Sequence, residues 1–260
     1  MKDFQTLRIR RQGPVCTIQM YRPDANNTIN GELIAEMHQA LDEAARLEHT
    51  IVVIEGLPEV FCFGADFGAV NERGAERIQQ DPEPLYELWH KLAAGPYITV
   101  AQVRGKVNAG GVGFVAACDI VLADGSARFS LSELLFGLIP ACVMPFLIRR
   151  VGYQKAHYLT TMTQPISAPQ ALAYGLVDAH EEQGDGLLRK HLLPLRRLSH
   201  KTIVRYKAFM NEVQPLSQAA RNVALTTNRQ VFSDPQNIAA IERYVTSGTF
   251  PWEAESSNVQ

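Results

Sequence analysis

Three short apolar runs constrain the fold of this chain more than any other feature. Residues 51–55 read IVVIE, residues 98–103 read ITVAQV, and residues 119–124 read DIVLAD. Continuous runs of this kind, rich in β-branched residues, are typical of strands that are covered on both faces. Helix-forming stretches separate them, and strands that alternate with helices pair in parallel through right-handed crossovers. The sequence therefore predicts an α/β core with largely parallel strands.

Helical periodicity divides the rest of the chain. Asn30 stands where it can cap a helix whose apolar residues recur on one face between positions 33 and 45. Residues 186–245 are mostly helical in pattern. We expect a core that holds the active site over residues 1–190 and a helical C-terminal region over residues 191–260.

A glycine-rich turn, NAGGVGF at residues 108–114, precedes a short expected helix. A phosphate-binding Walker loop would continue with Lys and then Ser or Thr, which are absent here. A dinucleotide-binding turn needs G-x-G-x-x-G after the first strand, and Gly110, Gly111 and Gly113 have another spacing. Close packing of a helix against a strand is one interpretation of this turn. A backbone that faces a reacting oxygen is the other.

A second turn of small residues favours the reacting oxygen. FCFGADF at residues 61–67 also ends an apolar strand. Two such turns on neighbouring parallel strands place free backbone N–H groups close together at one edge of the sheet. Two converging N–H donors in an apolar setting stabilise a thioester oxygen as it becomes an enolate. The positive end of the helix that begins at Gly111 acts at the same place.

These turns, with RPDANNTIN at residues 22–30 and ARFSLSELLFGLIP at residues 127–140, resemble the crotonase (enoyl-CoA hydratase/isomerase) superfamily. The resemblance covers residues 15–177 in the family's order. It implies a ClpP-like spiral of β-β-α turns with a helical C-terminal region that mediates trimers, or dimers of trimers. It also implies that the N–H groups of Ala65 and Gly110 are the oxyanion donors.

The resemblance implies one acid–base group. Hydratases of the family place one glutamate three residues after the oxyanion glycine, where this chain has Gly113, and a second at the position of Glu133. A carboxylate near an apolar pocket becomes a stronger base, and Glu133 has apolar neighbours in sequence. The aspartate that some isomerases and dehalogenases use corresponds to Ala141, which disfavours those chemistries.

Several strings look like one group within the family. GLPEVFCFGADF at residues 56–67 and VRGKVNAGGVGFVAACDIVLAD at residues 103–124 are similar to hydratase-like dehydratases of polyketide β-branching cassettes. This similarity implies loss of water from 3-hydroxy-3-methylglutaryl on an acyl carrier protein, with Glu133 removing the C2 proton. Another crotonase activity, as a CoA-dependent hydratase, isomerase or decarboxylase, is an alternative. A non-catalytic module that binds carrier proteins is a third interpretation.

The implied substrate has a distal carboxylate, which needs cations or hydrogen-bond donors. Each candidate also has a structural interpretation, as a solvated loop residue, a turn support or a packing residue. The candidate substrate-binding residues are Asp66, His90, Arg104, Lys106, Asn108 and Cys142.

The segment from Arg189 to Lys207, which we call the basic segment, has seven lysines and arginines and no acid. An acidic carrier protein or the phosphates of CoA would be attracted there, although such a run is also common on a solvated face. Relatives that use CoA often have a lysine shortly after G-A-D, where this chain has residues 67–69, FGA. This difference favours phosphopantetheine on an acyl carrier protein, and no other cofactor is implied.

Charge and composition exclude several classes of protein. A net charge of −2 does not suggest nucleic-acid binding. The apolar stretches are too short to span a membrane, and the start of the chain lacks a secretory signal, so we expect a cytoplasmic protein. The four cysteines lack the paired spacing of a disulfide framework or a zinc site, and no metal is expected: Cys16, Cys62, Cys118 and Cys142.

Overall fold

The computed structural model describes residues 4–66 and 81–256, and in this part the strands form a large and a small sheet. The predicted α/β class is confirmed, with largely parallel pairing. The large sheet has the order β1 (Leu7–Gln12), β2 (Val15–Met20), β3 (Ile51–Glu55), β5 (Ile98–Val103), β7 (Ile120–Asp124), β10 (Ala179–Glu181). The small sheet has the order β4 (Val60–Cys62), β6 (Lys106–Asn108), β8 (Arg128–Ser130), β9 (Ile166–Ser167).

From β3 to β8, consecutive strands alternate between the two sheets. In each of the pairs β3 and β4, β5 and β6, and β7 and β8, the first strand joins the large sheet and the second joins the small one. The helices α3 (Glu83–Ala94), α4 (Gly110–Ala117) and α5 (Met144–Met162) come after these pairs. This arrangement is the expected β-β-α spiral. It brings the carboxyl ends of β4, β6 and β8 to one edge of the small sheet.

The predicted buried strands and the first helix are confirmed. Ile51 to Ile54 of β3 are fully buried, because helices cover both faces of the large sheet. Helix α1 (Gly31–Arg46) begins after Asn30, whose side-chain oxygen accepts a hydrogen bond from the Leu33 N–H at 2.8 Å. The buried face of α1 contributes Leu33 to the main core.

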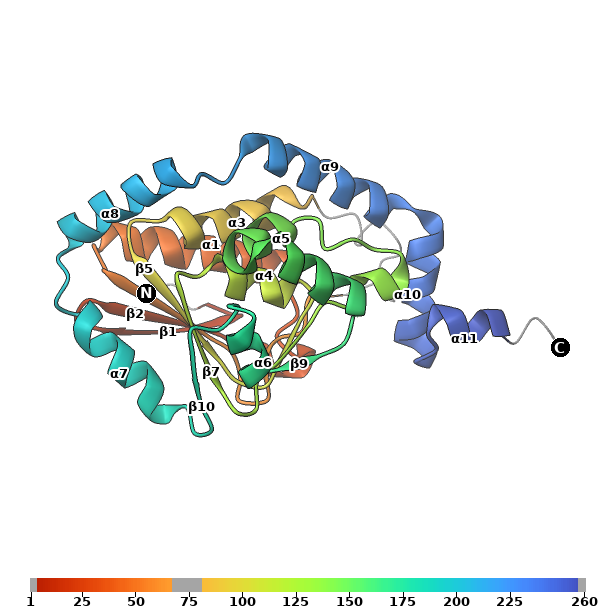
Figure 1. Cartoon of the computed structure of the whole chain (residues 1–260), viewed down its shortest axis with the longest axis horizontal. Coiled ribbons are helices and arrows are strands. Elements are labelled where there is room, and N and C mark those ends of the chain that lie inside the picture. The colour runs from red at the N-terminus through yellow and green to blue at the C-terminus, as the bar shows by residue number, and fades with distance from the viewer. Residues whose placement is uncertain (1–3, 67–80, 257–260) are drawn as a thin grey trace.

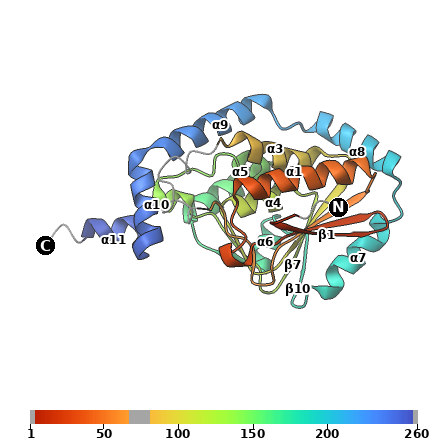
Figure 2. The same ribbon diagram turned by 180° about the vertical axis from the view of Figure 1, so that it is seen from behind.

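The C-terminal region is helical, as predicted. Figure 1 shows α8 and α9 running past α1, α3 and α5, and α11 projecting toward the C-terminus. The predicted boundary at 190/191 falls inside α7, whose Leu187 and Leu192 pack in the core on one face of the large sheet. The view from behind places α7 at the end of the molecule opposite α10 (Figure 2). The helices are α6 (Ala168–Ala173), α7 (Asp185–Leu195), α8 (His200–Val213), α9 (Gln218–Ser233), α10 (Pro235–Ser247) and α11 (Pro251–Ser256).

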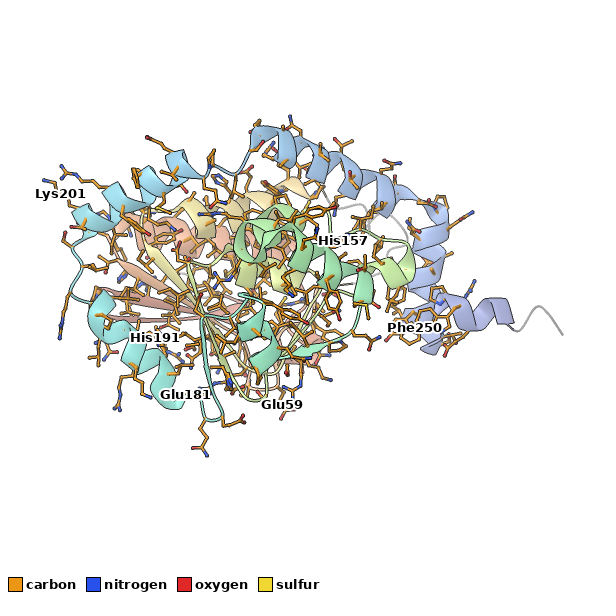
Figure 3. All side chains as sticks on the ribbon, in the orientation of Figure 1. Glu59, His157, Glu181, His191, Lys201 and Phe250 are labelled. Atoms are coloured by element: carbon orange, nitrogen blue, oxygen red, sulfur yellow. The ribbon has the colours of Figure 1, made fainter. Side chains whose placement is uncertain are left out.

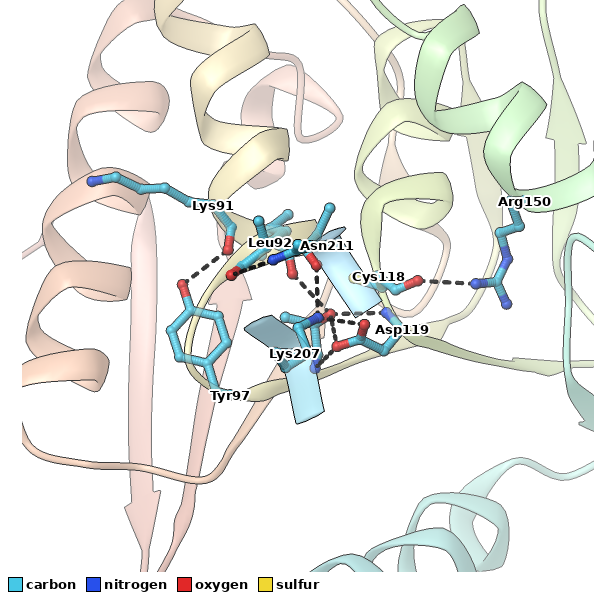
Figure 4. A network of polar contacts seen from close by, with 11 residues as sticks. Lys91, Leu92, Tyr97, Cys118, Asp119, Arg150, Lys207 and Asn211 are labelled. Atoms are coloured by element: carbon cyan, nitrogen blue, oxygen red, sulfur yellow. Dashed lines mark hydrogen bonds and ion pairs between the residues drawn. The ribbon is translucent and has the colours of Figure 1, made fainter. Parts of the chain in front are cut away.

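A buried lysine fixes α8 to the core. The side chain of Lys207 is 4% exposed, and its ammonium donates to the Ala93 carbonyl at 2.7 Å and to the Asp119 carboxylate. Asp119 also accepts a hydrogen bond from the Thr99 N–H at 2.8 Å, so the network links α8 to α3 and the large sheet (Figure 4). Lys207 belongs to the basic segment, but its charge is already neutralised inside the protein.

In the ranges that the structure describes, no helix combines the length and the apolar character that crossing a membrane requires.

Candidate active site

A cavity of about 1060 Å³ opens beside the carboxyl ends of the small-sheet strands. Its walls are mostly apolar and come from distant parts of the chain, including Phe63, Trp89 and Leu138. Ala65, Gly110 and Glu133, the three catalytic residues proposed from the sequence, all line it; we therefore treat it as the candidate active site. 

The two glycine turns touch each other at this edge. Gly64 has a φ of +94°, and a Cβ placed on it would lie 2.9 Å from the Ala109 Cβ and 3.7 Å from the Gly110 nitrogen. Ala109 itself has a φ of +51°, which a non-glycine residue rarely adopts. These backbone conformations turn the chain sharply after β4 and β6, and they bring the two oxyanion candidates onto one cavity.

Both candidate donors are free of other hydrogen bonds. Ala65 lies in a bridge to Ile29, in which the Ile29 N–H donates to the Gly64 carbonyl and the Asp66 N–H donates to the Ile29 carbonyl. This bridge does not use the Ala65 N–H. Gly110 is the first residue of α4, where an N–H has no partner within the helix. Among the residues that the structure describes, neither N–H donates to another group.

The glycine-rich turn at residues 108–114 also packs a helix closely against a strand, which was the other interpretation of this turn. A Cβ on Gly111 would lie 2.4 Å from the Cys62 carbonyl oxygen, so α4 approaches β4 too closely for any side chain at this position. Gly110 and Gly111 therefore have different reasons to be glycine. Gly110 faces the cavity, and Gly111 lets the helix pack against the strand.

Glu133 begins the short 3-10 helix η3 (Glu133–Phe136) and is only 8% exposed. One of its carboxylate oxygens is buried and has no hydrogen-bond partner among the residues that the structure describes. Burial raises the pKa of Glu133 to about 7, although nearby backbone N–H groups of Ser132 and Glu133 itself oppose that shift. A carboxylate of this pKa, with one oxygen free of protein partners in the described part of the chain, is suited to take up and return a proton near neutral pH.

An amide side chain ties the Glu133 loop to the oxyanion turn. The Asn108 amide donates to the Ser132 hydroxyl at 3.0 Å, and its oxygen accepts from the Ser130 hydroxyl at 2.8 Å. The Ala109 N–H also donates to the Ser130 carbonyl at 3.0 Å. Asn108 thus lines the cavity as the sequence suggested, and it connects the residue before Glu133 with the turn that presents Gly110.

Trp89 occupies the space next to Gly113. A Cβ placed on Gly113 would lie 2.5 Å from the indole Cζ2 of Trp89, and the Trp89 side chain is fully buried. The indole packs edge-on against Phe114 and Phe146. There is no room for an acidic side chain at position 113, so no second carboxylate can accompany Glu133 from that position.

Two of the predicted substrate-binding residues lie elsewhere. His90 is half-buried on α3 and is not among the cavity-lining residues, because the neighbouring Trp89 points inward instead. Arg104 also lies outside the cavity lining and stands 3.9 Å from Asp124. The prediction that these two side chains face the acyl pocket is therefore not supported.

The remaining candidates line the cavity. The Asp66 carboxylate forms an ion pair of 2.8 Å with the Arg22 guanidinium, which also donates to Thr28. The Asp66 carboxylate therefore supports the turn. Cys142 is buried in the wall, and burial raises its thiol pKa to about 12, which keeps the thiol neutral. Lys106 lines the cavity with an exposed side chain.

The C-terminal helices supply a wall of the cavity that the sequence did not reveal. Ile241 and Tyr244 of α10 line it, together with Phe250. The ring of Phe136 in η3 lies 5.1 Å from the Tyr244 ring, and Phe250 lies 4.7 Å from Tyr244, measured between ring centroids. Figure 3 shows Phe250 at the end of the molecule where α10 and α11 meet. Apolar residues in a helical tract carry no sequence signal that separates cavity wall from core.

Comparison with known proteins identifies the family of this chain. The enoyl-CoA hydratase/isomerase family model matches residues 10–255. The bacillaene synthase dehydratase PksH of Bacillus subtilis (strain 168) is 56% identical over 253 residues, which cover 96% of this chain and 97% of PksH. A crystal structure described as the polyketide biosynthesis enoyl-CoA hydratase pksH of Bacillus subtilis superposes with a TM-score of 0.92 over 96% of this chain and 100% of that chain.

A more distant relative is also a hydratase by its name. The 2,3-dehydroadipyl-CoA hydratase of Escherichia coli (strain K12) is 28% identical over 227 residues, which cover 86% of this chain and 88% of that protein. The family model spans nearly the whole chain and includes the cavity-lining residues named above. The chain therefore belongs to the enoyl-CoA hydratase/isomerase family, the crotonase superfamily.

Proposed function

We propose that this chain is a dehydratase of polyketide biosynthesis that acts on 3-hydroxy-3-methylglutaryl carried by an acyl carrier protein. The product is the 3-methylglutaconyl thioester. The observation that carries the proposal is the buried Glu133 carboxylate, with a pKa of about 7 and an oxygen without a partner, on a cavity that two free backbone N–H groups share. The similarity to the dehydratase PksH supports the same reaction class.

The reaction needs one proton to move twice. Glu133 takes the proton from C2 of the substrate, and the thioester carbonyl becomes an enolate whose oxygen accepts hydrogen bonds from the N–H groups of Ala65 and Gly110. As the enolate collapses, the C2–C3 double bond forms and the C3–O bond breaks. The departing hydroxyl takes the proton from Glu133 and leaves as water. Glu133 ends as the carboxylate with which it began.

A single acid–base group is sufficient for this substrate. The hydroxyl on C3 is tertiary, and such a group departs more readily than a secondary one. Trp89 fills the space beside Gly113, so a reaction with a second carboxylate there, as in ordinary hydratases of the family, is disfavoured. A module that only binds carriers would have no use for a buried, unpartnered carboxylate, because such a group costs stability.

Carrier protein, oligomer and location belong to the same proposal. We expect phosphopantetheine on an acyl carrier protein as the partner, a homotrimer or a dimer of trimers, and a cytoplasmic enzyme.

The basic segment supports carrier docking less well than the sequence suggested. Lys207 is buried in an ion pair, and Lys190 pairs with Glu181 at 2.6 Å. In addition, α7 and the start of α8 lie at the end of the molecule opposite α10 (Figure 1).

The test is substitution of the base. We expect Glu133→Gln to lower turnover of the glutaryl substrate by about 10²- to 10⁴-fold, because the amide cannot accept the C2 proton. Purified wild type and variant are incubated with the substrate on carrier protein and on CoA, and loss of water is followed by mass spectrometry. Circular dichroism of the variant serves as the control for folding.

Two outcomes would contradict this proposal differently. Near-normal dehydration by Glu133→Gln removes the assigned role of this residue but leaves the reaction. A wild-type protein that dehydrates neither form of the substrate overturns the reaction itself. Faster turnover on CoA than on the carrier protein would favour the CoA-dependent alternative.

A further inference from the structure

The small sheet carries two cations on the face that borders the cavity. Side chains alternate between the faces of a strand. Val107 of β6 and Phe129 of β8 are buried in the core, whereas their neighbours Lys106 and Arg128 line the cavity. Lys106 and Arg128 stand directly opposite each other in the parallel pairing of these strands. The two positive charges are therefore adjacent on one wall.

No carboxylate of the described chain neutralises this pair. Within residues 4–66 and 81–256, the side chain of Lys106 makes no ion pair or hydrogen bond, although its backbone N–H donates to the Glu59 carbonyl at 3.0 Å, and Arg128 makes no ion pair. One terminal nitrogen of Arg128, Nη1, donates to the carbonyls of Gly125 at 2.9 Å and Ala127 at 2.8 Å, which holds the guanidinium in place and leaves Nη2 and Nε available. Arg22, a further cation of the wall, is instead occupied by Asp66 and Thr28.

The spacing fits the length of a short diacid. Two residues further along the same strands and on the same face come Asn108 and Ser130, which adjoin the oxyanion turn and the Glu133 loop. Two residues of a strand span roughly 7 Å. The carboxylate carbon of a glutaryl thioester lies roughly 5 Å from its thioester carbonyl carbon, by standard bond lengths. The phosphate of phosphopantetheine is at the far end of a much longer arm.

We propose that Lys106 and Arg128 form the binding site for the carboxylate at the distal end of the acyl group. The proposal rests on the proposed function, because the substrate class sets the position of the anion. Arg128 offers two parallel N–H donors to a carboxylate, and Lys106 adds a point charge beside them. The site makes the enzyme selective for acyl groups that end in a carboxylate, while Ala65, Gly110 and Glu133 act on any thioester that fits.

The test compares two thioesters that differ only in this group. The N-acetylcysteamine thioester of 3-hydroxy-3-methylglutarate and its distal carboxamide have the same shape, and neither carries a phosphate. We expect Lys106→Met and Arg128→Leu each to weaken binding and lower kcat/KM for the carboxylate by about 10- to 100-fold and to leave the carboxamide nearly unchanged. Lys106→Arg should retain most of the preference. Arg104→Ala, a cation outside the cavity lining, is the matched control.

The outcomes separate this site from the proposed function. Equal losses on both thioesters, or no loss on either, overturn the carboxylate site even if dehydration is observed. Losses that occur only with CoA or carrier substrates assign the pair to the phosphate and also overturn it. If the wild type turns over neither thioester, calorimetry compares the affinities of wild type and variants for the two thioesters instead. The dehydratase proposal can then fail while the carboxylate site is still tested.

Discussion

Glu133, the proposed catalytic base, has a cost to folding. Its carboxyl group is buried, one oxygen has no partner, and its pKa rises to about 7 because burial disfavours the charged form. The protonated acid is the form that the folded protein accommodates best. In the proposed reaction Glu133 must nevertheless be ionised to act as the base, so the form that would be active is the less stable form.

This conflict predicts a pH-dependent stability. The folded protein binds the Glu133 proton more tightly than the unfolded chain, whose glutamate has a pKa near 4.5, so Glu133 lowers stability progressively as the pH rises from about 4.5 to about 7. Glu133→Gln removes this loss. The free energy of unfolding of the variant should gain on the order of 1–3 kcal/mol relative to wild type between pH 5 and pH 8. Urea denaturation at both pH values measures it, and a pH-independent difference would contradict the raised pKa.

At the residue scale, the motifs identified the candidate site but not its supports. Ala65, Gly110 and Glu133 were predicted from short strings, and all three line the cavity. The contacts of Asn108 with Ser130 and Ser132 depend on the register between β6 and β8, which no string contains. His90 does not line the cavity, because Leu88, Trp89 and Leu92 form the buried face of α3 and His90 lies beside that face.

At the scale of elements, the long apolar strands were predictable and the charged one was not. β3 and β5 consist of residues that favour strands and are buried almost completely. β1 reads LRIRRQ and is an edge strand that pairs antiparallel with β2. Its charged, exposed side chains interrupt the apolar pattern by which a strand is predicted from sequence. Charged side chains on an edge strand also protect it from pairing with other chains.

The attachment of α8 to the core predicts that substitution of one lysine, Lys207, lowers the stability of the protein strongly. Lys207 belongs to a basic run in the sequence, but its ammonium is buried against Ala93 and Asp119. Lys207→Ala should lower the free energy of unfolding by about 3 kcal/mol, because it leaves a carboxylate and a carbonyl without their partner. Urea denaturation gives the value.

Lys201→Ala on the same helix is the matched control. Lys201 is exposed at the start of α8 (Figure 3), and its loss should change stability by no more than about 0.5 kcal/mol. Similar effects of the two substitutions would show that the buried contact contributes little.

At the scale of the whole molecule, the exposed apolar surface is consistent with the proposed oligomer. Tyr206 and Phe209 on α8 and Val223 on α9 are more than half exposed. Such exposed apolar residues are often covered by a second chain. The boundary at 190/191 stays a prediction; α7, in which it falls, packs on the large sheet, and α10, which follows it, lines the cavity.

The trimer proposal makes its own prediction. Sedimentation of the wild type should give three times the mass of one chain, or six times for a dimer of trimers. Phe209→Lys should shift the protein toward smaller species, because burying a lysine in an apolar contact is costly. Glu212→Lys, a polar exchange on the same helix, is the control. A monomeric wild type would contradict the proposal.

The wall that α10 and Phe250 provide has a consequence for how such enzymes diversify. The groups proposed to act on the thioester lie on the spiral, whereas Ile241, Tyr244 and Phe250 are contributed by a tract that follows it in the chain. Mutations accumulating in that tract can reshape the space available to an acyl group and leave the proton chemistry untouched. Libraries that aim at new acyl specificities should therefore randomise these three positions first.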